Sequence, residues 1–192
     1  MPAPTADRIA TAALQILERE GPEAVSMRKV AQAVGITPMA IYHHFPSRAA
    51  LLQTITDREF ETLLAAFDAS VARGAPQTRL LRLMDNYVDY ALEHPRIFDY
   101  VFSQYRTGAR RFPDDFYARR SPTLNRVADT VDEAMRQGRL RKDDVWEVAL
   151  EFWAHAHGYI TLYRAGRFCL AEAQFRRLYR RSLRRLLDGL KG

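Results

Sequence analysis

The stretch Ser26–Leu52, SMRKVAQAVGITPMAIYHHFPSRAALL, constrains the fold more than any other part of this 192-residue chain. The spacing of its apolar residues predicts two short helices followed by the start of a longer one. Gly35 separates the first two helices, and glycine adopts the positive φ of a tight turn without a Cβ clash. Two short helices joined by such a turn are typical of a helix-turn-helix DNA-binding unit.

The inward positions of this unit are apolar and recur at helical spacing on both sides of the turn: Val30, Ala31, Val34, Ile36, Ile41 and Phe45. Thr37 is the predicted N-cap of the second helix, because its hydroxyl can accept a hydrogen bond from a free backbone N–H. Pro38 then occupies the first helical position, where its missing N–H costs nothing. Ser47 is the predicted cap of the long helix that follows.

The outward face of the second helix favours DNA binding over a plain packing unit with a glycine corner. Its side chains are Thr37, Met39, Ala40, Tyr42, His43 and His44. No carboxylate occurs from Ala24 to Ala50, whereas a solvent-exposed helix is usually rich in Glu, Lys and Gln. Small apolar tips suit thymine methyl groups, and hydroxyl and imidazole tips suit phosphates.

Over residues 5–60 the chain resembles the N-terminal DNA-binding domain of the TetR family of transcriptional regulators. The matching residues are Ile9–Leu14, Gly21, Ser26–Arg28, Val30–Ala31, Val34–Pro38, Ile41–Phe45, Ser47–Arg48 and Leu51–Leu52. The resemblance implies an all-α homodimer with a three-helix DNA-binding domain, a linking helix and a larger helical domain that binds an effector and dimerises. It also implies a ligand-responsive regulator, expected to be a repressor, that binds a palindromic operator in double-stranded DNA.

The resemblance further implies which residues contact DNA: Ser26, Arg28, Thr37, Pro38, Met39, Ala40, Tyr42, His43, His44 and Arg48. Among them, Arg48 takes the place of the usual phosphate-binding cation, which is more often a lysine. Arg28 has the fork geometry for a bidentate contact with guanine, worth roughly 1–3 kcal/mol of discrimination. For Tyr42 an alternative stays open, because an aromatic ring at this position can also pack against the first helix.

The net charge of +6 is no independent support for DNA binding, because the charge lies elsewhere. Residues 1–48 hold five basic against four acidic residues, whereas residues 167–192 hold eight against two. In that last segment apolar residues recur at helical spacing, which predicts an amphipathic helix with a solvated basic face. The alternatives are nonspecific attraction to DNA, or a partner-binding or anionic-membrane-binding helix that uses this basic face.

The rest of the chain also shows helical spacing, so the predicted fold is all-α with nine or so helices. Besides those described above, helices are expected at residues 5–20, 47–72, 77–93, 95–105, 121–136, 143–163 and 171–187. A loop with a short turn is expected at 106–120, where Arg, Gly and Pro are frequent. The predicted domains are a DNA-binding domain at 1–48, with its linking helix at 47–72, and an effector-binding and dimerisation domain at 76–192.

The helix expected at 143–163 is apolar on nearly every side, which is easiest to bury if a second subunit covers part of it. Together with the last helix it predicts a two-fold interface that joins two copies of the chain. The stretches Ala91–Pro95 and His155–Gly158 also resemble an effector domain found in part of the TetR family.

Aromatic residues of the second domain are candidates for an effector pocket that takes a small apolar or aromatic ligand. They are Tyr87, Tyr90, Phe98, Phe102, Tyr105, Phe116, Phe152, Trp153 and His157. For each of them the alternative is a plain core position, because aromatic residues at helical spacing usually pack in a core.

No catalytic or metal-binding motif occurs in the sequence, so neither an enzyme nor a cofactor is expected. Cys169 is the only cysteine, which excludes an internal disulfide and suits a reducing compartment. The first ten residues lack the apolar core of a signal peptide, and no apolar run is long enough to span a membrane. A cytoplasmic protein without a membrane partner is therefore expected.

Overall fold

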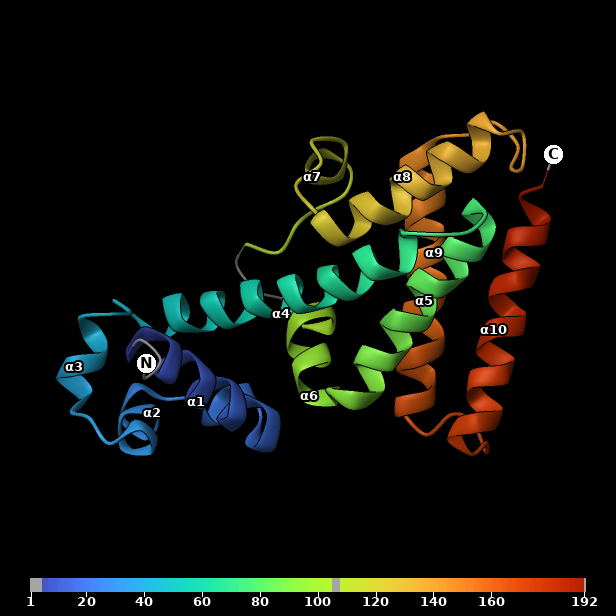
Figure 1. Ribbon diagram of the computed structural model, residues 1–192. Helices are drawn as coiled ribbons and strands as arrows, with labels where there is room; N and C mark the ends of the chain where they lie inside the picture. Colours follow the sequence, from blue (N-terminus) through green and yellow to red (C-terminus); the bar gives the residue numbers. More distant parts are fainter. Residues whose placement is uncertain (1–4, 105–107, 192) are drawn as a thin grey trace. The chain divides into compact units, whose positions relative to one another are not determined.

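The computed structural model describes residues 5–104 and 108–191, and this part of the chain contains helices and no strand (Figure 1). Its α-helices are α1 (Thr5–Glu20), α2 (Met27–Val34), α3 (Pro38–Tyr42), α4 (Arg48–Val71), α5 (Pro76–Glu93), α6 (Pro95–Phe98), α7 (Asp114–Tyr117), α8 (Pro122–Arg136), α9 (Val145–Arg164) and α10 (Glu172–Gly189). A 3-10 helix, η1 (Pro22–Ala24), and a π-helical turn, η2 (Asp99–Ser103), complete them. The predicted all-α fold is confirmed.

Packing divides the chain into two units. The N-terminal unit consists of residues 1–62 and 92–106, and the C-terminal unit consists of residues 63–91 and 107–192. Helix α4 contributes to both units, and α6 with η2 belongs to the N-terminal one. The predicted domain boundaries follow the order of the chain and stay a prediction, whereas the packing units bring together segments that are distant in sequence.

Helix α1 lies at the centre of the N-terminal unit and packs against α2, η1 and α6. Its buried face consists of Ile9, Ala10, Ala13, Ile16 and Leu17. Near the end of α1, Arg96 donates through Nη1 to the carbonyl oxygen of Glu18 at 3.0 Å, and His94 Nδ1 lies 2.8 Å from Glu18 Oε1. These contacts attach α6 to the helix that packs against α2. Over the helix predicted at 95–105, the structure is helical from 95 to 103, as α6 followed directly by the π-helical turn, and residue 105 lies outside the described residues.

In the C-terminal unit α9 packs against both α8 and α10. The face of α9 that these helices cover contains Val148, Ala149, Phe152, Ala156 and Ile160. The exposed residues of the opposite face are Glu147, Glu151, Ala154, Thr161 and Leu162. Leu162 has 48% of its surface exposed, which is unusual for a large apolar residue in this protein. A single chain therefore covers one side of this strongly apolar helix and leaves the other side open.

Helix α10 is amphipathic, as predicted. Its buried side contains Phe175, Tyr179, Leu183 and Leu187, and the Tyr179 hydroxyl donates to the Met84 carbonyl oxygen at 2.7 Å. Burial raises the pKa of Tyr179 well above its usual value, so this hydroxyl stays protonated. The exposed side carries arginines that form no ion pair with any described residue: Arg177, Arg181, Arg184 and Arg185.

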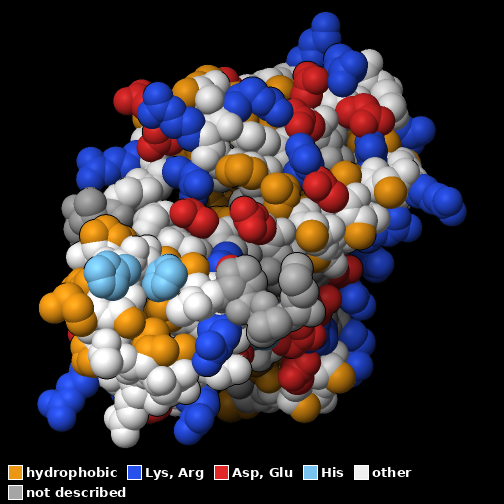
Figure 2. All heavy atoms as spheres, turned by 60° about the vertical axis from the view of Figure 1, so that its left-hand side comes forward, with side chains coloured by type: hydrophobic (Ala, Val, Ile, Leu, Met, Phe, Trp, Pro, Cys, Tyr) orange, Lys and Arg blue, Asp and Glu red, His pale blue; other side chains and the backbone are white. Residues whose placement is uncertain are grey.

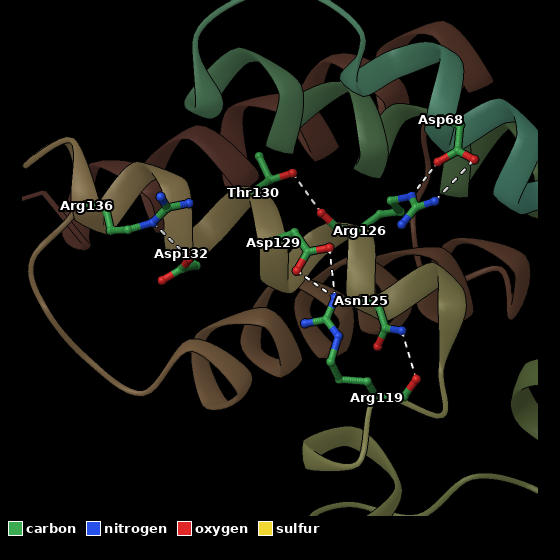
Figure 3. A network of polar contacts seen from close by, with 8 residues as sticks. All are labelled: Asp68, Arg119, Asn125, Arg126, Asp129, Thr130, Asp132 and Arg136. Carbon is green, nitrogen blue, oxygen red and sulfur yellow. Dashed lines mark hydrogen bonds and ion pairs between the residues drawn. The ribbon is translucent and has the colours of Figure 1, made fainter.

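Polar contacts of α8 hold the C-terminal part of α4 and the turn that precedes α8 (Figure 3). Arg126 pairs with Asp68 of α4, and the hydrogen bond from Arg126 lowers the pKa of the Asp68 carboxyl. Arg119 donates to both carboxylate oxygens of Asp129, at 2.8 and 3.0 Å. Asn125 donates to the Arg119 carbonyl oxygen at 2.9 Å. Since these side chains are mostly half-exposed, each pair contributes at most about 1 kcal/mol.

His155 gives the contact between α9 and α10 a pH dependence. Its Nε2 lies 2.6 Å from Ser182 Oγ, and burial lowers its pKa below the usual 6.5. At pH values between this lowered pKa and 6.5, His155 is protonated in the unfolded chain but not in the folded chain. The free energy of unfolding therefore decreases as the pH falls through this window.

We therefore expect His155→Gln to flatten the decrease in the free energy of unfolding as the pH falls below the usual histidine pKa of 6.5. Urea unfolding at several pH values measures it. His43→Gln, on the exposed face of α3, is the control and should leave the pH profile as in the wild type. Parallel profiles for His155→Gln and the wild type would contradict the assignment.

Candidate DNA-binding surface

The turn between α2 and α3 is formed by Gly35, which has φ 76° and ψ 36°. Its N–H donates to the carbonyl oxygens of Ala31 at 2.9 Å and Gln32 at 3.3 Å, and Ile36 N–H donates to Ala31 at 3.0 Å. These bonds satisfy two of the carbonyl groups in the last turn of α2, those of Ala31 and Gln32. The left-handed backbone that the sequence predicts for Gly35 is confirmed, and it sets the direction in which α3 leaves α2.

Helix α3 begins and packs as its sequence predicts. The Thr37 hydroxyl accepts from Ala40 N–H at 3.2 Å, and Pro38 follows as the first helical residue. Ile41 and Phe45 are both buried. Ser47 caps α4 in the same way, since its hydroxyl accepts from Ala50 N–H at 3.1 Å. Local capping and two apolar anchors therefore decide which face of α3 points to solvent.

The outward face of α3 is open. Thr37, Pro38, Met39, Tyr42, His43 and His44 are exposed, and Ala40 is half-buried. Met39 exposes 68% of its surface and Tyr42 49%, which places both among the most exposed large apolar residues of the described chain. Figure 2, which turns the side of α1 to α3 forward, shows apolar and histidine side chains gathered on this part of the surface. The exposure of Tyr42 leaves its ring available to a ligand.

Ser26 and Arg28 lie at the start of α2 and differ in their intramolecular hydrogen bonds. The Ser26 hydroxyl caps α2 by accepting from Lys29 N–H at 3.2 Å, in addition to the DNA contact that the resemblance implies for it. Arg28 is exposed and has no hydrogen-bond or ion-pair partner among the described residues. Its guanidinium group is therefore available for a contact outside the chain.

Arg48 is held inside the N-terminal unit. Its Nε donates to the Val25 carbonyl oxygen at 2.6 Å and its Nη2 donates to the Pro22 carbonyl oxygen at 2.5 Å. The Glu23 carboxylate lies 3.9 Å from Nη2. The phosphate contact predicted for Arg48 stays a prediction, whereas this side chain has intramolecular partners that no spacing rule indicates.

Four of the nine effector candidates come together in the C-terminal unit. Tyr87 lies between two ring nitrogens: Trp153 Nε1 donates to its hydroxyl at 2.9 Å, and His157 Nδ1 lies 3.0 Å from it. Because an indole N–H only donates, the Tyr87 hydroxyl accepts from Trp153 and can donate to His157. Phe116 meets Trp153 edge to face at 6.2 Å between ring centroids. Burial raises the pKa of Tyr87, so its hydroxyl stays neutral.

The other candidates have different surroundings. Phe98 and Phe102 belong to the N-terminal unit, where the Phe102 ring lies tilted against Phe98 at 5.2 Å and edge to face with Phe60 at 5.4 Å between ring centroids. Phe152 is fully buried and Tyr90 is 6% exposed. Tyr105 lies outside the described residues. In the described ranges we find no group of three or more His, Cys, Asp or Glu side chains placed to hold a metal ion, and no helix there is long and apolar enough to cross a membrane.

Comparison with known protein families supports both parts of the chain. Residues 9–55 match the family described as "Bacterial regulatory proteins, tetR family". Residues 80–186 match the family described as "Tetracyclin repressor-like, C-terminal domain". The first match contains the candidate DNA-binding helices, and the second contains the aromatic cluster around Tyr87.

Individual proteins are also similar to this chain, either in sequence or in fold. The HTH-type transcriptional repressor KstR of Mycolicibacterium smegmatis is 31% identical over 157 residues, which cover 76% of this chain and 74% of KstR. A Rhodococcus sp. RHA1 protein of unknown function has a similar structure, with a TM-score of 0.84, 24% identity, and coverage of 100% of this chain and 97% of that one. The regulator FadR of Bacillus subtilis, solved with stearoyl-CoA, has a TM-score of 0.76 at 13% identity, with 95% and 98% coverage.

Proposed function

Because the chain belongs to the TetR family of DNA-binding transcriptional regulators, we propose that it is a repressor whose homodimer binds a palindromic operator and releases it when a small effector binds. One observation carries this proposal. The exposed face of α3 presents apolar, hydroxyl and imidazole side chains without a carboxylate, on a helix fixed by a cap and two buried anchors.

The proposed contacts divide by side-chain chemistry. Met39 and Ala40 suit thymine methyl groups in the major groove, and Tyr42 and His44 suit phosphate oxygens. Arg28 suits a guanine edge. The hydroxyl oxygens of Thr37 and Ser26 accept the cap bonds of α3 and α2, and their O–H groups remain able to donate to DNA.

The homodimer is proposed from the open face of α9. Burying the exposed Leu162 and the small residue Ala154 against a second copy would cover the side of α9 that one chain leaves uncovered. A two-fold dimer would place two recognition helices in successive major grooves, about 34 Å apart. One chain alone would contact half of such an operator.

The proposed effector is small and apolar or aromatic. The cluster of Tyr87, Phe116, Trp153 and His157 combines aromatic surface with two ring nitrogens and one hydroxyl, which is the usual composition of a ligand site. The FadR structure with stearoyl-CoA shows a protein of this fold with a long acyl ligand, so an acyl chain is one class to test. A 100-fold loss of operator affinity requires about 2.7 kcal/mol of coupling between effector and DNA.

Selection of duplex DNA from a random library tests the proposal. We expect enriched sequences with two-fold symmetry and half-sites about one helical turn apart, bound by a dimer that sediments as such at micromolar concentration. Binding should weaken steeply with salt, because several phosphates are contacted. Enriched sequences without symmetry, or a monomer that binds with full affinity, would overturn the palindrome and the dimer.

The arginines exposed on α10 offer a second candidate function, binding of an acidic partner or surface. Measuring operator binding separates recognition by α3 from binding through the basic face of α10. Replacing both Arg181 and Arg184 by Gln should leave operator binding within about twofold if α3 carries recognition. A loss that exceeds tenfold would instead favour the basic helix.

A further inference from the structure

Arg48 joins two parts of the N-terminal unit that are far apart in sequence. It is the first residue of α4, and its two hydrogen bonds reach the carbonyl oxygens of Pro22 and Val25, 26 and 23 residues earlier. Pro22 begins η1, and Val25 is the residue before Ser26, the N-cap of α2. Arg48 therefore connects the start of α4 to the segment that starts α2.

Besides Arg48, this segment is held by α1, which packs against η1, and by backbone hydrogen bonds. η1 has only three residues, and at its start the Gly21 N–H donates to the Leu17 carbonyl oxygen of α1 at 2.8 Å. Val25 is fully buried, and its N–H donates to the Pro22 carbonyl oxygen at 3.2 Å. Both carbonyl groups bound by Arg48 thus lie in the short stretch that sets where α2 begins. Because α2 continues through Gly35 into α3, a shift of this stretch moves the recognition helix.

Two parallel donors of a guanidinium group fix an orientation, which a single ammonium group does not. Nε and Nη2 of Arg48 each take one carbonyl oxygen, in the way that a planar fork binds two acceptors. A lysine would keep the positive charge but could hold these two oxygens only as a point charge on a flexible stem. The geometry therefore requires arginine, where a phosphate contact would be served by either cation.

We propose that Arg48 is a positioning residue, which clamps the η1–α2 junction to the start of α4 and thereby sets the orientation of α2 and α3 for DNA binding. The phosphate contact that the resemblance predicts for Arg48 is the alternative that the test below decides. The proposal rests on the proposed operator binding for its effect on affinity, but the clamp itself exists in the free protein.

The test compares Arg48→Gln, Arg48→Lys and the wild type, with Arg58→Gln as the matched control. Arg58 lies ten residues further along α4, has a similarly half-exposed guanidinium group and pairs with Asp7. Operator affinity is measured by fluorescence anisotropy over a range of salt concentrations, well below the melting temperature of each variant. Circular dichroism checks that each variant is folded.

We expect both Arg48 variants to bind operator at least about tenfold more weakly, with the slope of log affinity against log salt unchanged. Arg58→Gln should keep both affinity and slope. A phosphate ligand gives the opposite pattern, because Lys would restore affinity and Gln would lower the slope by about 0.9 for each phosphate that is no longer bound. That pattern, or a purely thermal effect with full affinity in the folded state, would overturn the proposal.

Hydrogen exchange in the free protein separates the clamp from the function. In Arg48→Lys the amides of Val25 and Lys29 should exchange at least about tenfold faster, while those of α5 keep the wild-type rate. Unchanged exchange at Val25 and Lys29 contradicts the clamp even if DNA binding falls. If the wild type binds no DNA sequence but exchange in Arg48→Lys is faster, the proposed function is contradicted. The clamp is then still supported, because it exists in the free protein.

Discussion

Replacing Met39 with glutamate is expected to weaken operator binding by about 100-fold or more and to leave the protein folded. Met39 is 68% exposed at the start of α3, so the new side chain needs no space in the core. A carboxylate there would meet the electronegative floor of the major groove and nearby phosphates. Like-charge contacts of this kind cost several kcal/mol, and 100-fold corresponds to about 2.7 kcal/mol.

Anisotropy titration with the selected operator measures this loss, and thermal unfolding checks the fold. Ala65→Glu is the control, because it adds the same charge at an exposed helical position outside the DNA-binding helices. We expect it to stay within about twofold of the wild type. Retained affinity in Met39→Glu would show that another surface of the protein binds DNA.

Replacing Phe152 with alanine is expected to lower the free energy of unfolding by about 3–5 kcal/mol, the largest effect on stability that we predict. Phe152 is fully buried on the side of α9 that faces the rest of the C-terminal unit. Removing its ring leaves a cavity that the surrounding helices fill only in part. Because domains are stable by about 5–15 kcal/mol, this is a large share of the total.

Urea unfolding measures this change in the free energy of unfolding. The protein concentration is kept fixed, because dimerisation would make the unfolding midpoint depend on concentration. Phe112→Ala is the matched control. The Phe112 ring contacts Phe116 and Tyr117, but 39% of its surface is exposed to solvent. Its loss should stay near 1 kcal/mol or below, as is usual for partly exposed positions. Equal losses for the two phenylalanines would mean that α9 is not the centre of this unit.

Helix-turn-helix geometry could be predicted from sequence because each of its determinants acts over four residues or fewer. The Gly35 turn, the Thr37 cap and the inward positions Ile41 and Phe45 all depend on spacing and backbone chemistry alone. The structure has each of them where the sequence predicts it. Resemblance to the TetR family, confirmed over most of the chain, then supplied the residues proposed to contact DNA.

The effector candidates could not be sorted from sequence, because periodicity marks a residue as inward without saying what it meets. Tyr87 and Trp153 bond to each other across 66 residues, and Phe98 and Phe102 belong to the other packing unit. Aromatic residues that pack in a core and aromatic residues that line a binding site recur at the same helical spacing in the sequence. Distinguishing them needs the positions of the neighbouring helices.

From the sequence alone follow the helical class, the turn at Gly35 and the solvent-facing side of α3, since each is set by backbone preferences and by the burial of apolar side chains at helical spacing. Only the tertiary structure decides that Arg48 holds Pro22 and Val25, and that Arg96 and His94 attach α6 to α1 through Glu18. These bonds join residues 23–78 positions apart. Their acceptors are backbone oxygens and the half-exposed carboxylate of Glu18, which leave no periodic pattern in the sequence, so only the packed chain selects them.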